Sequence, residues 1–181
     1  MTRWVLWLIA GLLLGGIVHI GTILLLPSSA TQDAYSRLAN MTAVNTVTLL
    51  PATSADTALL PFMDPAFAVA VCRYDLSAGP LKLVSAVGQA YSSVSFYTRQ
   101  GIVYYAINDR AAGRRVIELD LMTTEQRALL PEDEEVTAAD RLIVEAPTPT
   151  GLILLKVLAP EPGAMPAARG VLATARCQPQ A

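Results

Sequence analysis

The strongest constraint in this sequence is an uninterrupted apolar run near its start. Between Trp4 and Leu26 there is no Asp, Glu, Lys or Arg. As a helix rising about 1.5 Å per residue, these roughly 23 residues span about 34 Å, enough to cross a hydrocarbon core of about 30 Å. Trp4 and Trp7 lie at the N-terminal end, where indole rings favour the headgroup level. The sequence therefore predicts a transmembrane helix over residues 4–26, ended by Pro27.

A cleaved export signal is the alternative interpretation of the same run. Ser28 and Ala30 loosely fit the small residues that precede a cleavage site. The apolar core of such a signal, however, has only about 7–15 residues. We therefore expect a retained anchor with residues 1–3 in the cytoplasm, because Arg3 precedes the helix and no basic residue follows until Arg37. In this orientation the rest of the chain is extracytoplasmic.

One face of this helix carries small and polar residues. The spacings of four, four and three residues place Gly11, Gly15, His19 and Thr22 on one stripe. Gly11 and Gly15 would let a second helix approach closely, and His19 and Thr22 can hydrogen-bond across such a contact. The interpretation we favour is that glycine is simply common in membrane helices and that His19 lies near the outer interface. The alternative hypothesis is that this face packs against a partner helix.

The remainder of the chain is long enough for one ordinary domain. Apolar and polar residues alternate in several stretches, as in Arg115–Leu121, where Ile117 and Leu119 point inward and Glu118 and Asp120 point outward. On this basis we predict short strands over Phe67–Tyr74, Leu81–Val87, Tyr91–Tyr97, Ile102–Asn108, Arg115–Leu121, Arg141–Ala146 and Leu152–Leu158.

Turn residues connect these strands. Gly101 suits a hairpin between the third and fourth predicted strands, and the Pro-rich segment 147–151 is expected to pair the last two. Short helices are predicted over Thr31–Met41, Thr123–Leu130 and Met165–Arg176. The expected fold is mainly β: an antiparallel β-sandwich or barrel-like domain over residues 65–177 with short flanking helices. Residues 31–64 would form a short helix and an irregular lead-in.

Several kinds of function are improbable from composition alone. The net charge is −2 and no basic stripe occurs, so nucleic-acid binding lacks its electrostatic basis. His19 is the only histidine and lies in the anchor, which excludes a Ser-His-Asp or Cys-His relay in the domain. Zinc or iron bound by imidazole would lack ligands, and no Gly-rich phosphate loop is present. We therefore assign no catalytic residue, no metal and no cofactor.

Cys72 and Cys177 are the only two cysteines. In an oxidising compartment they can pair and tie the C-terminal tail to the first predicted strand. The alternative is two unpaired thiols, with Cys72 buried in its strand. Spacing in the sequence leaves both open, because a disulfide depends on the distance between the two backbones.

Two polar groups are candidate sites in the domain. The densest cluster after a strand could bind an anionic group through bidentate hydrogen bonds and consists of Asn108, Asp109, Arg110 and Arg114. Its alternative interpretation is an ordinary turn. Glu118 and Asp120 could hold a hard cation or form an acid/base pair, but a solvated face explains them better.

Strand and turn motifs of the domain resemble a known bacterial family. The motifs are Asp64-Pro65, Tyr74-Asp75-Leu76-Ser77-Ala78-Gly79-Pro80, Tyr91-Ser92-Ser93-Val94, Tyr105-Ala106-Ile107-Asn108-Asp109-Arg110 and Ala146-Pro147-Thr148, together with the Ala-rich tail that ends in Cys177. Over roughly residues 35–177 the chain is similar to the family of domain of unknown function 1254. The resemblance implies an antiparallel β fold without an established activity.

The resemblance also implies a location and a partner. A bacterial single-pass protein in this orientation would lie in the inner (plasma) membrane, in contact with the lipid bilayer, with its C-terminal domain in the periplasm. Larger members of the family carry a related domain, number 1214, in the same chain. The resemblance therefore suggests that a second membrane-anchored protein carries that domain here and associates with this one.

Three classes of function follow from the sequence. The leading one is a non-catalytic component of a membrane complex. The second is a small-molecule or glycan-binding β domain, which would need a concave pocket lined by Tyr91, Tyr97, Tyr104 or Tyr105. The third is a hydrolase that uses carboxylates such as Asp75, Asp109 or Glu118.

Overall fold

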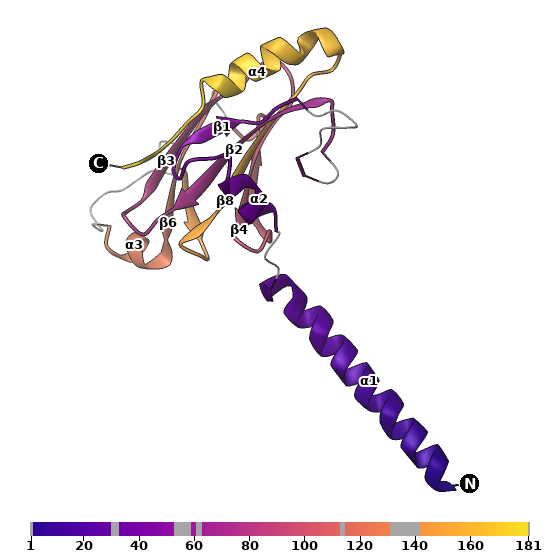
Figure 1. Cartoon of the computed structure of the whole chain (residues 1–181). Coiled ribbons are helices and arrows are strands. Elements are labelled where there is room, and N and C mark those ends of the chain that lie inside the picture. Colours follow the sequence, from indigo (N-terminus) through magenta and orange to yellow (C-terminus); the bar gives the residue numbers. More distant parts are fainter. Residues whose placement is uncertain are drawn as a thin grey trace. The chain divides into compact units, whose positions relative to one another are not determined.

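The computed structural model describes residues 2–29, 33–52, 59–60, 63–112, 115–130 and 142–180. The chain divides into two compact units, Met1–Asp33 and Ala34–Ala181, which are considered separately (Figure 1). The first unit contains one helix, α1 (Thr2–Ser29), and its side chains up to Leu26 are exposed apart from the partly covered Gly21. The predicted N-terminal apolar helix is confirmed, but Pro27 does not end it, since α1 continues to Ser29. Its length and composition over Thr2–Leu26 fit a membrane span and also fit an export signal.

The second unit confirms the predicted mainly β fold as a two-sheet sandwich with short helices. One sheet has the order β1-β2-β8-β4-β5 and the other the order β7-β6-β3-β9, so neither closes into a barrel among the described strands. The strands are β1 (Val47–Leu49), β2 (Phe67–Asp75), β3 (Leu81–Ala86), β4 (Ser92–Thr98), β5 (Val103–Asn108), β6 (Val116–Thr123), β7 (Leu142–Ala146), β8 (Thr150–Leu158) and β9 (Arg176–Pro179). The helices are α2 (Ala34–Ala39), α3 (Thr124–Ala128), a 3-10 turn (Pro162–Ala164) and α4 (Met165–Ala173).

The main core lies between the two sheets. Alternate residues of the strands point into it, for example Leu81 and Leu83 of β3 and Leu119 and Leu121 of β6, all fully buried. Burying a leucine of this kind stabilises the fold by roughly 1.5–3 kcal/mol. Helix α4, the yellow helix in Figure 1, adds Ala168 and Leu172 to the same core. The period-two pattern in the sequence therefore reports the inner faces of the two sheets correctly.

Strand β2 departs furthest from this alternation, because five consecutive residues, Ala68–Cys72, are buried and both of its faces are covered. Ala68, Ala70 and Cys72 belong to the inner core. Val69 and Val71 point the other way and belong to a second apolar cluster with Leu38 and Leu50. A strand buried on both sides has a continuous apolar sequence, and the Phe67–Cys72 part of β2 fits that description.

The predicted hairpin between β4 and β5 is present. Gly101 has a positive φ of 82°, and its backbone N–H donates to the Thr98 carbonyl oxygen at 3.0 Å. Thr98 N–H donates in turn to the Ile102 oxygen at 2.9 Å. Glycine suits this position because it tolerates the left-handed region without steric cost.

The predicted pairing of residues 141–146 with 152–158 is wrong. Strand β7 lies parallel to β6 in the four-stranded sheet, with Leu119 opposite Leu142, whereas β8 is the middle strand of the other sheet. Pro147 and Pro149 carry the chain from one sheet to the other, and without backbone N–H groups they cannot continue a ladder. The Pro149 oxygen instead accepts a hydrogen bond from Leu76 N–H at 2.8 Å. The domain is accordingly mixed and not purely antiparallel.

Two short strands, β1 and β9, form where the sequence predicts an irregular segment and the end of a helix. The C-terminal helix ends at Ala173 and not at Arg176, because the following residues pair with β3 as β9, placing Cys177 opposite Leu83. Strand β1, in the expected irregular lead-in, pairs with β2 through Thr48 and Val71. Both strands are too short to show a period, and they form because each covers a sheet edge.

The boundaries of the other helices also shift. Helix α2 is confined to Ala34–Ala39, and its predicted cap, Thr31, lies outside the described residues. Helix α3 begins after Thr123, whose side chain accepts from Gln126 N–H while the Gln126 side chain accepts from Thr123 N–H. This reciprocal capping box satisfies two backbone donors and fixes the start of the helix.

Gly151 occupies a position where two segments of the five-stranded sheet approach each other closely. A Cβ atom there would lie 2.2 Å from the Tyr97 carbonyl oxygen and 2.4 Å from the Tyr74 hydroxyl oxygen. Neither neighbour is free to move, since the first is backbone and the second belongs to a fully buried side chain.

We therefore expect Gly151→Ala to lower the free energy of unfolding by about 1–3 kcal/mol, the range found for overpacked cores. Gly170→Ala is the matched control, because that position is exposed, lies inside α4 and has open space around it. The control should be neutral or stabilising by about 0.5–1 kcal/mol. Chemical unfolding of the full chain in detergent, followed by circular dichroism, measures both, and equal stability of the two variants would contradict the close approach.

Candidate functional site

A disulfide joins the two sheets through the core. Cys72 of β2 and Cys177 of β9 are bonded, with their Cα atoms 6.5 Å apart and 105 positions between them in sequence. Both side chains are buried. The bond fastens the last strand of the chain to the doubly buried strand β2, so that the C-terminal segment is held by a covalent link as well as by its pairing with β3.

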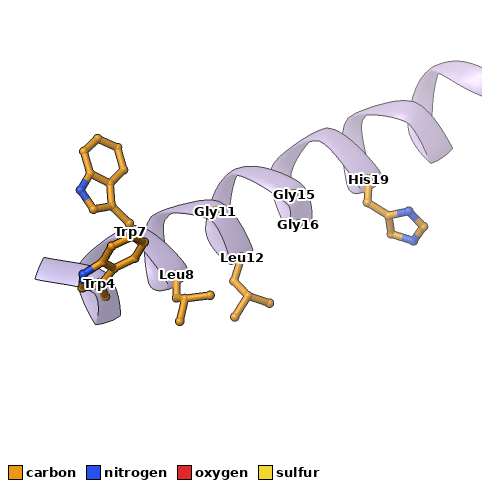
Figure 2. Close-up of a pocket in the computed structure, with 8 residues that line it drawn as sticks. All are labelled: Trp4, Trp7, Leu8, Gly11, Leu12, Gly15, Gly16 and His19. Atoms are coloured by element: carbon orange, nitrogen blue, oxygen red, sulfur yellow. The ribbon is translucent and has the colours of Figure 1, made fainter. Parts of the chain in front are cut away.

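A shallow groove runs along one side of α1. It is lined by Trp4, Trp7, Leu8, Gly11, Leu12, Gly15, Gly16 and His19 (Figure 2). Three of the four residues predicted for a helix-packing face, Gly11, Gly15 and His19, therefore share one surface. The fourth, Thr22, donates its hydroxyl to the Val18 carbonyl oxygen at 2.8 Å within the same helix. The open space over Gly11 and Gly15 suits the close approach of another backbone.

The polar cluster after β5 is engaged in a turn. The Asn108 side chain accepts from Ala111 N–H at 3.2 Å, and Asp109 N–H donates to the Ser92 oxygen at 2.9 Å. Arg110 is exposed, and Arg114 lies outside the described residues. Asn108 and Asp109 thus take part in the backbone hydrogen bonds of an ordinary turn. Anion binding by this cluster stays a prediction.

The four tyrosines proposed for a binding pocket lie in different environments. Tyr97 packs against the second apolar cluster, which contains Leu38. Tyr104 and Tyr105 lie against the inner core, with ring centroids 6.1 Å and 5.8 Å from that of Phe96. Tyr91 is the most exposed and meets the Phe67 ring edge-on at 6.4 Å. They therefore do not line one common pocket.

Tyr104 takes part in a buried hydroxyl chain instead. Its hydroxyl donates to the Tyr74 hydroxyl at 3.1 Å, and Tyr74 donates to the Tyr97 carbonyl oxygen at 3.4 Å. Burial raises the pKa of Tyr74 and raises the pKa of Tyr104 far above its ordinary value. Both hydroxyls are accordingly neutral hydrogen-bond donors at physiological pH, and their role is to satisfy polar groups inside the sandwich.

The carboxylates proposed for hydrolysis each have a separate interaction. Asp75 accepts from Ser77 N–H at 2.9 Å, and hydrogen bonds from the Ser77 side chain and backbone hold the pKa of Asp75 below its usual value. Glu118 forms an exposed ion pair with Lys82 at 2.5 Å. Among the described residues, no group of three or more His, Cys, Asp or Glu side chains is placed to hold a metal ion.

The prediction of a solvated face for Asp120 is wrong. Asp120 is 1 % exposed and accepts a hydrogen bond from the Gln180 side chain. Gln180 follows β9, and its backbone N–H donates to the Pro80 oxygen at 2.9 Å, so the C-terminal segment covers this side of β6. Alternation along β6 correctly predicts that Asp120 lies on the outer face. It does not predict that the C-terminal segment, with Gln180, covers this face.

The structure also brings together three residues that the sequence analysis did not connect. The Tyr35 ring of α2 has the Arg73 Cζ atom 5.4 Å from its centroid and the Arg99 Cζ atom 5.3 Å from it. These distances are within the range of cation–π attraction. The three residues are far apart in the chain and belong to no motif, so no local signal in the sequence could have found them.

Comparison with known proteins agrees with this architecture. The model of a family described as "Protein of unknown function (DUF1254)" matches residues 44–179. The structure of the VPA0106 protein from Vibrio parahaemolyticus is similar, with a TM-score of 0.58 at 10% identity over 80% of this chain and 32% of that one. A structure of an uncharacterized protein from Burkholderia cenocepacia has a TM-score of 0.46 at 11% identity over 75% of this chain and 34% of that one.

The chain thus spans about a third of the length of these two proteins. At 10% identity, the likeness to the Vibrio protein shows a common fold over the 80% of this chain that it covers. No curated protein matches the chain.

The disulfide leads to a direct test. Replacing both cysteines by alanine should lower the free energy of unfolding by about 4–5 kcal/mol, because the bond closes a long loop in the unfolded chain. Chemical unfolding in detergent measures the loss, and reduced wild-type protein is the control that should match the double variant. A thiol assay on the unfolded, unreduced chain should find no free thiol; two reactive thiols would contradict the bond.

Proposed function

Since the chain belongs to the DUF1254 family, whose activity is unassigned, we propose that it is a membrane-anchored, non-catalytic component of a complex in the bacterial inner membrane. In this proposal α1 is the retained anchor and the β domain lies in the periplasm. The family match covers the β domain, at residues 44–179, so the anchor is a feature of this chain beyond the matched region.

The observation that carries the proposal is the exposed apolar surface of α1. Its large side chains between Trp4 and Leu26 are all at least half exposed, with Leu12 at 76 %. Water contact is unfavourable by about 25 cal/mol for each Å² of such surface, and soluble proteins rarely expose so much of it. Hydrocarbon is a suitable environment, because the helix satisfies its own backbone hydrogen bonds.

Location in the periplasm is supported by two further features. Arg3 is the only charged side chain before the apolar run, which favours a cytoplasmic N-terminus. The Cys72–Cys177 bond fits an oxidising compartment, because thiols of cytosolic proteins are kept reduced. Both arguments favour export of the β domain over the opposite orientation.

Membership of a complex is supported by the groove of α1 and by the length of the related proteins. Gly11 and Gly15 leave space for a second helix, with His19 available for a hydrogen bond. The Vibrio protein extends well beyond the shared domain. We propose that a second membrane-anchored protein, carrying domain 1214, is the partner of this chain.

The anchor is tested by fractionation. We expect the protein expressed in a bacterium to stay in the membrane pellet after alkaline carbonate washing, with an intact mass that includes residues 4–26. Replacing Leu13 and Ile17 by arginine should release it, since each charge at the centre of a membrane helix costs about 2.5–3.5 kcal/mol. A mature wild-type chain that starts near residue 30 and is soluble would overturn the proposal.

The packing face is tested by photo-crosslinking in native membranes. A benzoylphenylalanine in place of Leu12 should trap a second protein, because that position lines the groove and leaves Gly11 and Gly15 intact. The same group at position 13, on the other side of the helix by spacing, should trap little. Mass spectrometry identifies the trapped chain. Equal yields at the two positions, or no product at position 12, would rule out this face as the contact.

A further inference from the structure

The cluster of Tyr35, Arg73 and Arg99 gathers two positive charges on one side of the five-stranded sheet. Tyr35 comes from α2, Arg73 from β2, and Arg99 from the turn between β4 and β5. Because both Cζ atoms lie within 5.4 Å of one ring centroid, they are no more than about 11 Å apart. The aromatic ring holds each guanidinium by its π face, but it supplies no negative charge.

Neither arginine has an acidic partner within the described part of the chain. Arg73 is half-buried and donates from Nη2 to the Thr42 carbonyl oxygen at 3.1 Å. Its Nε is buried without an acceptor. Arg99 is exposed, and its contact is with the Tyr35 ring. Two uncompensated charges this close repel each other, and bound anions would remove that repulsion.

The chain length between α1 and the cluster indicates where such anions come from. Tyr35 follows Ser29, the last residue of α1, by six positions. Six residues reach at most about 20 Å when fully extended. For an anchored chain, the nearest dense source of phosphate is therefore the headgroup layer of the bilayer. Guanidinium N–H groups suit phosphate oxygens. The exposed Arg99 can offer paired hydrogen bonds, whereas Arg73, with Nη2 bonded to Thr42 and Nε buried, contributes mainly its positive charge.

We propose that Arg73 and Arg99, positioned by Tyr35, bind the phosphate groups of anionic phospholipids and hold the β domain against the membrane surface. This inference rests on the proposed anchoring by α1. It assigns the cluster to a lipid surface, since the exposed Arg99 can contact a headgroup while Arg73 adds a second positive charge beside it. A basic residue near an anionic bilayer strengthens binding about fivefold.

The test uses the full chain in nanodiscs of phosphatidylcholine, with and without phosphatidylglycerol. Hydrogen–deuterium exchange of the backbone around Arg99 should slow when phosphatidylglycerol is present. Arg99→Gln should reduce this protection about fivefold, and Arg73→Gln should reduce it as well. Arg176→Gln is the matched control: Arg176 is also exposed but lies on β9 of the other sheet, and its loss should leave the protection unchanged.

Three results would overturn the inference. The first is protection that does not depend on phosphatidylglycerol, and the second is equal protection in wild type and Arg99→Gln. The third is the same protection in pure phosphatidylcholine on adding inorganic phosphate, which would make a soluble anion the ligand. A chain that fails to enter nanodiscs at all would instead contradict the anchoring, so the two proposals fail in distinguishable ways.

Discussion

Burial of both faces of β2 is the constraint on which the rest of the domain depends. Its inner face meets the core between the sheets and carries Cys72, which fixes the C-terminal strand. Its outer face, through Val69 and Val71, holds α2 by way of Leu38. Because one strand serves both layers, a change in its register would move the core, the disulfide and the first helix of the domain together.

The same strand also positions Arg73, one of the two arginines beside the Tyr35 ring. Arg73 follows the buried outer residues Val69 and Val71 of β2, is half-buried, and lies beside the Tyr35 ring of α2. Four other polar residues stabilise the fold: Asn108 and Asp109 take part in the hydrogen bonds of a turn, Asp75 accepts a hydrogen bond from Ser77 after β2, and Asp120 is covered by the C-terminal segment. These four side chains are therefore engaged in the fold of the domain itself.

Sequence patterns predicted the long strands because successive side chains of a strand point to opposite faces of the sheet, which gives an alternation of apolar and polar residues. Alternation along β3, β4 and β6 reports one face in the core, and Gly101 marks a turn that needs positive φ. The failures share a cause. Strands β1 and β9 are too short for a period, and the partner of β7 depends on where Pro147 and Pro149 direct the chain. The strand that pairs with an edge strand lies far away in the sequence, so a pattern within a few neighbouring residues cannot identify it.

The sequence by itself determined an apolar helix long enough for a bilayer, a mainly β domain, and the absence of a histidine from that domain. These properties follow from composition and from the spacing of apolar residues along the chain. Both the transfer of a helix into hydrocarbon and the alternation of strand side chains depend on neighbouring residues only. Only the tertiary structure decided that Cys72 meets Cys177, that Asp120 is covered, and that Arg73 and Arg99 share one tyrosine ring. Each of these depends on bringing together segments that are remote in the chain, and the packing of two sheets, not any local preference, sets those distances.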